Sequence, residues 1–115
     1  MSIYEKTYNL ITGTGTTLPV SPVEQQENVR PPSIIFEPVL SGDKAKQPGV
    51  QDDVDLLILI YAVDLATADD QGLALRSALD YHCDESFSSV RFDRQTGVWR
   101  EGYYILLQRY KLKMK

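Results

Sequence analysis

The chain has 115 residues, of which 43% are hydrophobic and 24% are charged, and its 16 acidic and 12 basic side chains leave a net charge of −4. This composition is typical of one globular domain, residues 1–115, and excludes a disordered chain. The single cysteine, Cys83, excludes an internal disulfide. The longest apolar run, residues 56–63, is much shorter than the roughly 20 residues of a transmembrane helix. The N-terminus lacks signal-peptide features, so we expect assembly in the cytosol without membrane association.

A short helix is expected at the N-terminus. Ser2 and Glu5 have the spacing of a capping box, in which each side chain accepts a hydrogen bond from the other residue's backbone N–H. Tyr4, Tyr8 and Ile11 recur at helical spacing and predict one buried stripe. Glycines within the next four residues end the helix.

The sequence predicts strands in the middle of the chain. Prolines make residues 16–32 an extended connection, with a short edge strand at about 20–24, and residues 33–40 form a strand in which Pro38 indicates an edge or a bulge. Residues 41–51 are small and polar and predict a long mobile loop. Residues 52–63 are the most strand-like stretch, and apolar side chains occupy both of its alternating faces. Each face of that strand therefore needs a cover, which helices could supply on one side and a second sheet or subunit on the other.

A second helix is expected over residues 64–84. Thr67 and Asp70 have the spacing of a cap, and the predicted buried face consists of Ala68, Gly72, Leu75, Leu79 and His82. A strand over 86–94, a turn at 95–97 and a last strand over 98–110 follow, with a flexible tail at 111–115. The order predicts an α+β fold: a mainly antiparallel four- to five-stranded sheet with two helices packed on one face.

The sequence contains only weak signals of catalytic or ligand-binding groups. His82 and Cys83 are neighbours whose side chains would project about 100° apart on a helix, so they do not form an activated nucleophile. The acidic groups Asp52, Asp53, Asp55 and Asp64, Asp69, Asp70 could be imagined as Mg²⁺ sites, but strand flanking and helix capping already explain them. The glycine-rich residues 13–17 lack the lysine of a phosphate loop. We expect no catalytic, cofactor or metal site, and no enzyme.

Charge is unevenly distributed along the chain. Residues 1–90 contain 5 basic and 14 acidic side chains, whereas residues 91–115 contain 7 basic and 2 acidic ones. The basic residues share the C-terminal hairpin with Phe92, Trp99, Tyr103 and Tyr104, and such interleaving is also found in single-stranded nucleic-acid-binding modules. A solvated strand edge, kept soluble by its charges, is the simpler interpretation.

The arrangement as a whole resembles a known family: the small tail-terminator, or tail-completion, proteins of long-tailed bacteriophages, including head–tail joining proteins. The resemblance covers nearly the whole chain. It rests on the N-terminal helix and its proline-broken connection, residues 30–36 (RPPSIIF), the Ser41-Gly42 loop, the strand at 52–63, the helix at 66–81 and the closing strands that end in residues 103–107 (YYILL).

The resemblance implies a non-enzymatic virion protein at the head–tail junction. Such proteins form a homo-oligomeric ring, usually a hexamer, that caps the tail tube, ends its polymerisation and presents a docking surface to the head-completion or connector protein; DNA passes through the lumen without specific binding. Neck or baseplate adaptors are the alternative within virions. The residues expected to contact partners or neighbouring copies are basic or aromatic side chains of the polar loop and the C-terminal hairpin: Lys44, Lys46, Arg91, Arg94, Trp99, Arg100, Arg109 and Lys111.

Overall fold

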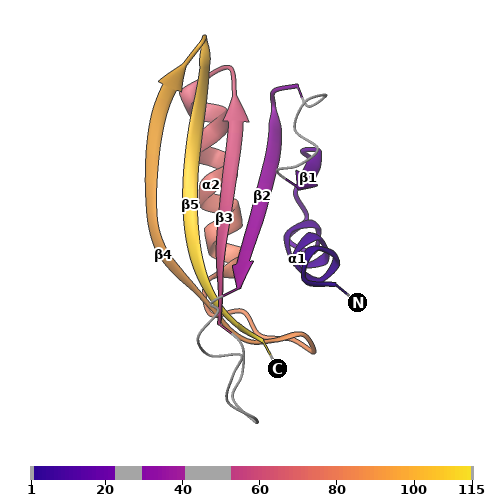
Figure 1. Ribbon diagram of the computed structural model, residues 1–115. Helices are drawn as coiled ribbons and strands as arrows, with labels where there is room; N and C mark the ends of the chain where they lie inside the picture. The colour runs from indigo at the N-terminus through magenta and orange to yellow at the C-terminus, as the bar shows by residue number, and fades with distance from the viewer. Residues whose placement is uncertain (1, 23–29, 41–52, 115) are drawn as a thin grey trace.

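The computed structural model describes residues 2–22, 30–40 and 53–114. Two helices, α1 (Ile3–Thr12) and α2 (Leu65–Leu79), accompany five strands, β1 (Val20–Pro22), β2 (Ser33–Leu40), β3 (Asp53–Ala62), β4 (Phe87–Arg100) and β5 (Tyr103–Met114), as Figure 1 shows. Neither helix is long and apolar enough to cross a bilayer. The loop expected at 41–51 lies outside the described residues.

The five strands form one sheet in the order β1-β2-β3-β5-β4. β1 runs parallel to β2, and the other three pairings are antiparallel, so the sheet is mixed. The α+β class is confirmed. The short β1 ends opposite Phe36, so the second half of β2, with Pro38, lies beyond it. This placement agrees with the expectation that Pro38 marks a sheet edge.

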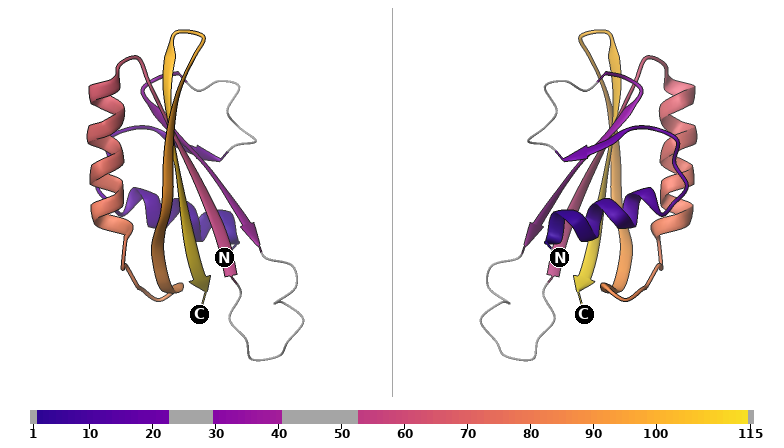
Figure 2. Two further views of the ribbon diagram at one scale, coloured as in Figure 1. Left: turned by 90° about the vertical axis from the view of Figure 1, so that its left-hand side faces the viewer. Right: turned by 90° about the vertical axis from the view of Figure 1, so that its right-hand side faces the viewer.

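Both helices lie on the same side of the sheet, which we call the helix face (Figure 2). α1 packs near β1 and β2, and α2 packs on β3, β5 and β4. The even-numbered residues of β3, from Val54 to Ala62, point to this side and are at most 1% exposed. The core that they form with the helices and the other strands comprises Leu10, Ile11, Ile34, Phe36, Val54, Leu56, Ile58, Ile60, Ala62, Ala68, Leu75, Leu79, Phe87, Val90, Leu106, Tyr110 and Leu112.

The N-terminal helix forms as predicted, but with a different buried face. The Ser2 Oγ accepts a hydrogen bond from the Glu5 N–H at 3.2 Å. Thr7, Leu10 and Ile11 are buried, whereas Tyr8 is 43% exposed. The buried stripe of the helix therefore runs through Thr7, Leu10 and Ile11 and not through Tyr4 and Tyr8. The centres of the two tyrosine rings each lie 6.4 Å from the centre of the Phe36 ring.

The second helix is shorter than expected and begins with a different cap. Asp64 is the N-cap, and its carboxylate accepts a hydrogen bond from the Thr67 N–H at 2.7 Å. Thr67 is therefore inside the helix, and the cap predicted at Thr67 was wrong. The helix ends at Leu79 because Asp80 is extended and Tyr81 has a φ of 68°. The buried face from Ala68 to Leu79 is confirmed, while His82 lies beyond the helix.

The C-terminal hairpin turns later than predicted. β4 continues through residues 95–97, and the turn is at Glu101 and Gly102, whose φ values are 53° and 86°. Two positive φ values in succession characterise the two-residue turn that suits the twist of a hairpin. Gly97 serves another purpose: a Cβ there would collide with the Tyr104 ring on the next strand. Residues 111–114, expected as a flexible tail, pair within β5.

The turn between α2 and β4 is organised by the Asp84 carboxylate. Its Oδ1 accepts hydrogen bonds from the Ser86 and Phe87 N–H groups at 2.7 and 2.9 Å, and its Oδ2 lies 2.9 Å from His82 Nε2. Partial burial raises the pKa of Asp84, but the hydrogen bonds of Phe87, His82 and Ser86 outweigh this, so that its pKa lies below the usual range.

We expect Asp84 to contribute to acid stability. Because its folded-state pKa is lowered, the stabilisation is fully present above the unfolded-state value of about 3.9 and is lost as the pH falls through the lower folded value. Asp84→Asn should therefore be less stable than the wild type at pH 7, and the two proteins should converge near pH 2. Urea unfolding at several pH values measures this, and a difference that does not depend on pH would contradict it.

Candidate interaction face of the sheet

The side of the sheet opposite the helix face, which we call the open face, has no described helix on it (Figure 2). Side chains alternate along a strand, so the odd-numbered residues of β3 and β5 point to this side. Leu57, Leu59 and Tyr61 of β3 are half-buried there, in contrast to the fully buried residues between them. Within the described residues, the strand predicted to be apolar on both faces is therefore fully buried on only one of them.

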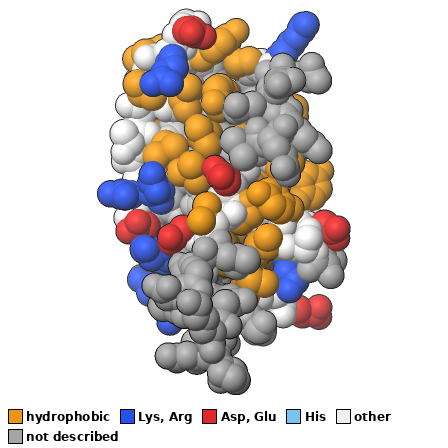
Figure 3. Space-filling model, viewed as in Figure 1, with side chains coloured by type: hydrophobic (Ala, Val, Ile, Leu, Met, Phe, Trp, Pro, Cys, Tyr) orange, Lys and Arg blue, Asp and Glu red, His pale blue; other side chains and the backbone are white. Residues whose placement is uncertain are grey.

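An apolar band occupies the middle of the open face (Figure 3). In this band Leu59 pairs with Leu107, and Tyr61 pairs with Ile105, across β3 and β5. Val98 of β4, opposite Ile105, extends the band and is 46% exposed. An apolar patch rimmed by polar groups is a common feature of protein–protein contacts.

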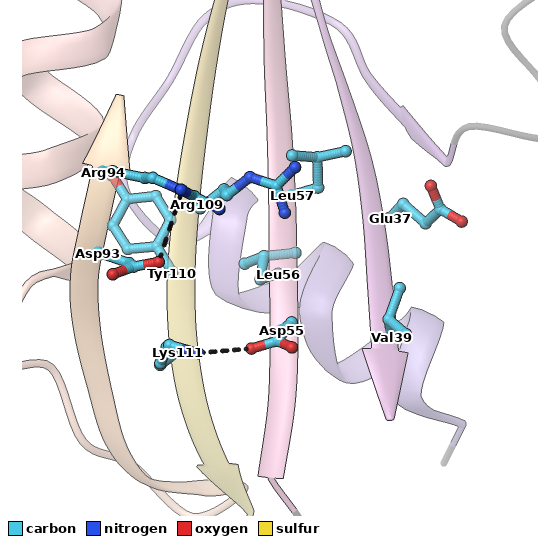
Figure 4. Close-up of a pocket in the computed structure, with 10 residues that line it drawn as sticks. All are labelled: Glu37, Val39, Asp55, Leu56, Leu57, Asp93, Arg94, Arg109, Tyr110 and Lys111. Carbon is cyan, nitrogen blue, oxygen red and sulfur yellow. Dashed lines mark hydrogen bonds and ion pairs between the residues drawn. The ribbon is translucent and has the colours of Figure 1, made fainter. Parts of the chain in front are cut away.

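Next to the apolar band lies a charged hollow of about 180 Å³ (Figure 4). Arg109 of β5 lies between Leu57 of β3 and Arg94 of β4 in the register of the sheet. The ladder shifts between Phe92 and Arg94, which makes Asp93 the extra residue of a β-bulge. As a result, Asp93 and Arg94 both line the hollow, although they are neighbours in sequence.

The charges in this hollow are incompletely paired. Lys111 Nζ lies 3.3 Å from the Asp55 carboxylate, and Arg94 Nε lies 3.9 Å from Asp93, at the limit of an ion pair. Within the described ranges, Arg109 has no ion pair or hydrogen bond through its guanidinium. Arg94 and Arg109 are direct cross-strand neighbours, and like charges in that position destabilise a sheet.

The hairpin residues expected to contact partners are thus distributed over several places. Arg94, Arg109 and Lys111 meet in the hollow (Figure 4). Arg91 lies at the β4 edge, where its guanidinium is 4.1 Å from the centre of the Tyr81 ring and 3.7 Å from the Asp80 carboxylate. Arg100 lies at the end of β4, next to the turn. Lys44 and Lys46 lie outside the described residues.

Three of the four aromatic residues of the hairpin lie on the helix side, and the fourth, Tyr103, lies on the open face opposite Arg100. Trp99 stacks edge-to-face on Tyr104 with ring centres 5.1 Å apart, on the helix side. Phe92 packs on the buried Tyr110 and lies under the Arg76 guanidinium at 4.0 Å. Residues that alternate in the sequence project to opposite faces of a sheet, so these rings and the hollow's arginines do not form one stacking surface.

Some of the remaining candidate groups have structural partners, and Asp52 lies outside the described residues. His82 is bonded to Asp84, and Cys83 is exposed. Asp64 caps α2. Among residues 2–22, 30–40 and 53–114, no three or more His, Cys, Asp and Glu side chains are grouped as a metal site would require.

Two features of the hollow could not be predicted from the sequence. The bulge at Asp93 has no compositional signal, and without it Arg94 would be expected on the opposite face. Glu37 also lines the hollow, from β2, more than fifty residues before Arg94 in the chain. Only the pairing of β2 with β3, and of β3 with β5, brings it to this surface.

Comparison with known proteins shows the fold. A chain from the structure "Virion of native gene transfer agent (GTA) particle" superimposes with a TM-score of 0.67 and 13% sequence identity, over 98% of this chain and 91% of that one. No protein-family model matches the sequence. No curated protein sequence matches it either.

Proposed function

We propose that this chain is a structural, non-enzymatic protein of a phage-like virion, where it forms a homo-oligomeric ring at the end of the tail tube. The ring stops polymerisation of the tube and provides the docking surface for the head connector. The observation that carries this proposal is the fold likeness, over 98% of the chain, to a chain of a gene transfer agent virion. The sequence pattern of tail-terminator proteins, found independently of that likeness, supports the same role.

The open face supports a role in assembly. Leu57, Leu59 and Tyr61 remain half-buried in the isolated chain, and association removes such apolar surface from water at about 25 cal/mol per Å². Closed rings arise when each copy contacts the next through two different surfaces. The charge difference between the hairpin and the rest of the chain favours such head-to-tail contacts.

The proposed role can be tested with the tail-tube protein encoded in the same genome. Tubes polymerised in the presence of this protein should be shorter than tubes polymerised alone, and negative-stain electron microscopy should show an added ring at one end. Serum albumin at equal concentration is the control for crowding. Tubes of unchanged length without an end ring would overturn the proposal, and binding at another position on the particle would favour a neck or baseplate adaptor.

The nucleic-acid alternative has its own measurement. The basic and aromatic side chains of the hairpin lie largely on different faces, so we expect no tight binding of single-stranded DNA. Titration of a labelled oligonucleotide at 50 and 200 mM salt tests this, because charge-driven affinity falls steeply with salt.

A further inference from the structure

We propose that the open face of one copy binds the outer surface of α2 of a second copy, and that this contact is the repeating contact of the ring. The inference rests on the proposed function and adds to it the two surfaces that meet. The cationic pair Arg94 and Arg109 would face Asp69 and Asp70 of the neighbour. Leu73 of the neighbour would lie on the apolar band.

The outer surface of α2 has the shape that a flat sheet face can accept. The helix is the outermost element on its side of the molecule (Figure 2). Its buried residues, Ala68, Gly72, Leu75 and Leu79, define one face, and helical geometry places Ala66, Asp70, Leu73, Ala74 and Ser77 opposite them. All five outer residues are exposed, and Leu73 is 67% exposed. The surface therefore has small side chains, one protruding leucine and the Asp70 carboxylate, and the exposed Asp69 lies at its flank.

The charges on the open face indicate that a second copy of this chain binds there. Arg94 and Arg109 lie side by side on the open face, and Arg109 has no ion partner in the described part of the chain. Asp69 and Asp70 are exposed, and neither forms an ion pair within that part. Arg109, with Arg94 beside it held only by a long contact to Asp93, lies on the opposite side of the molecule from Asp69 and Asp70. These opposite charges are therefore complementary between copies, not within one copy.

The spacing of the residues on α2 matches the spacing of the residues that they would contact on the open face. Asp69 and Leu73 are four residues apart on a helix, which separates them by about 6 Å along its axis. On the open face, Arg109 and Leu107 are two residues apart on a strand, about 6.6 Å. A helix aligned with the strands can therefore place its carboxylates on the arginines and its leucine on the band at the same time. The 15 residues of α2 span about 22 Å, less than the roughly 33 Å of the ten-residue β3.

The contact is tested directly by cysteine trapping. In a Cys83→Ser background, Leu59→Cys and Leu73→Cys together should give a ladder of disulfide-linked oligomers on oxidation at high protein concentration, because each copy then carries both halves of the contact. Each single-cysteine variant should give dimers at most. The same double-cysteine protein without oxidation is the control. A ladder no stronger than that of the single-cysteine proteins would overturn the proposal.

Charge reversal tests the pairing of the side chains. Added to the double-cysteine protein, Arg94→Glu with Arg109→Glu should reduce the ladder at least tenfold, and so should Asp69→Lys with Asp70→Lys. An equimolar mixture of the two proteins should restore it, because each surface then meets an opposite charge. Lys6→Glu with Arg30→Glu makes the same charge change outside both surfaces and should leave the ladder intact. A ladder insensitive to either reversal, or not restored by mixing, would overturn the pairing. Circular dichroism checks that every variant is folded.

The outcome separates this contact from the proposed function. Rings on tail tubes without a disulfide ladder would reject the contact and retain the function. A ladder formed by a protein that neither caps nor shortens tubes would retain the contact and reject the function.

Discussion

Gln108→Ala is expected to lower the free energy of unfolding by about 4 kcal/mol, because Gln108 connects three elements inside the core. Its side chain is fully buried. Nε2 donates hydrogen bonds to the Gly72 carbonyl of α2 at 2.9 Å and to Gln95 Oε1 of β4 at 3.1 Å, and Oε1 accepts one from the Tyr110 hydroxyl at 2.8 Å. Truncation would leave the buried Tyr110 hydroxyl without its acceptor, at a cost of about 1–3 kcal/mol, and would add a cavity. It would also remove the second hydrogen bond of the Gly72 carbonyl, which keeps its bond within α2.

The buried Tyr110 hydroxyl stays protonated and needs an acceptor. Burial raises the pKa of the Tyr110 phenol, a shift that Arg76 opposes only in part, so the hydroxyl remains a donor at all ordinary pH values. Its acceptor must then come from the core, and Gln108 Oε1 is the acceptor that the structure provides.

Thermal and urea unfolding measure the effect, and two variants control it. Gln95→Ala removes only the partly exposed partner of the network and should cost less than about 1 kcal/mol. Gln108→Leu with Tyr110→Phe removes the polar groups together and should recover much of the loss, because replacing both partners by apolar groups can be nearly neutral. A change below about 1 kcal/mol for Gln108→Ala would show that the network is not a main determinant of stability.

Much of the fold could be predicted from the sequence because its apolar patterns are long and regular. The strand at 33–40 was predicted at the bounds that β2 has, and the alternation of Tyr104, Leu106 and Gln108 against Tyr103, Ile105 and Leu107 agrees with the faces of β5. Burial on one side of a sheet imposes period two on a strand, and the period is visible in a single sequence.

The predictions that were wrong concern positions where two local sequence signals compete. Gly97 follows two polar residues and resembles a turn, yet its lack of a side chain makes room for the Tyr104 ring on the next strand. The turn that the structure has, at Glu101 and Gly102, contains only one glycine. Its position in the sequence is set by the pairing between β4 and β5. In the same way, Asp64 and Thr67 are both residue types that favour an N-cap. Because β3 ends at Ala62, the helix begins at Leu65 and Asp64 is the cap.

The candidate site was predictable in composition but not in geometry. The sequence indicated a basic hairpin and a strand apolar on both faces, and these are the two constituents of the open face. It did not indicate that a bulge separates Phe92 from Arg94, or that Arg109 lies beside Arg94. Register is set by long-range pairing, so no local pattern specifies which charges become neighbours.

α2 approaches the sheet closely at Gly72, and Gly72→Val is expected to destabilise the protein by about 3 kcal/mol. A Cβ at this position would collide with Leu106 Cδ2 and lie 3.2 Å from Gln108 Nε2. Leu106 is 2% exposed and has little room to move. The helix would have to shift outward, which would also stretch the hydrogen bond from Gln108 to the Gly72 carbonyl.

Alanine at the same position separates packing from helix propensity. Gly72→Ala gains up to about 1 kcal/mol of helix propensity but meets a packing cost of about 1–3 kcal/mol, so a net loss of about 1 kcal/mol is expected. At the exposed Ala74, Ala74→Gly should lose only the propensity, about 1 kcal/mol. Combining Gly72→Ala with Leu106→Val frees the space, and urea unfolding should then show less destabilisation than the sum of the two single variants. Additive losses would mean that Leu106 does not limit the approach of the helix, and that the close packing of α2 is set by the backbone instead.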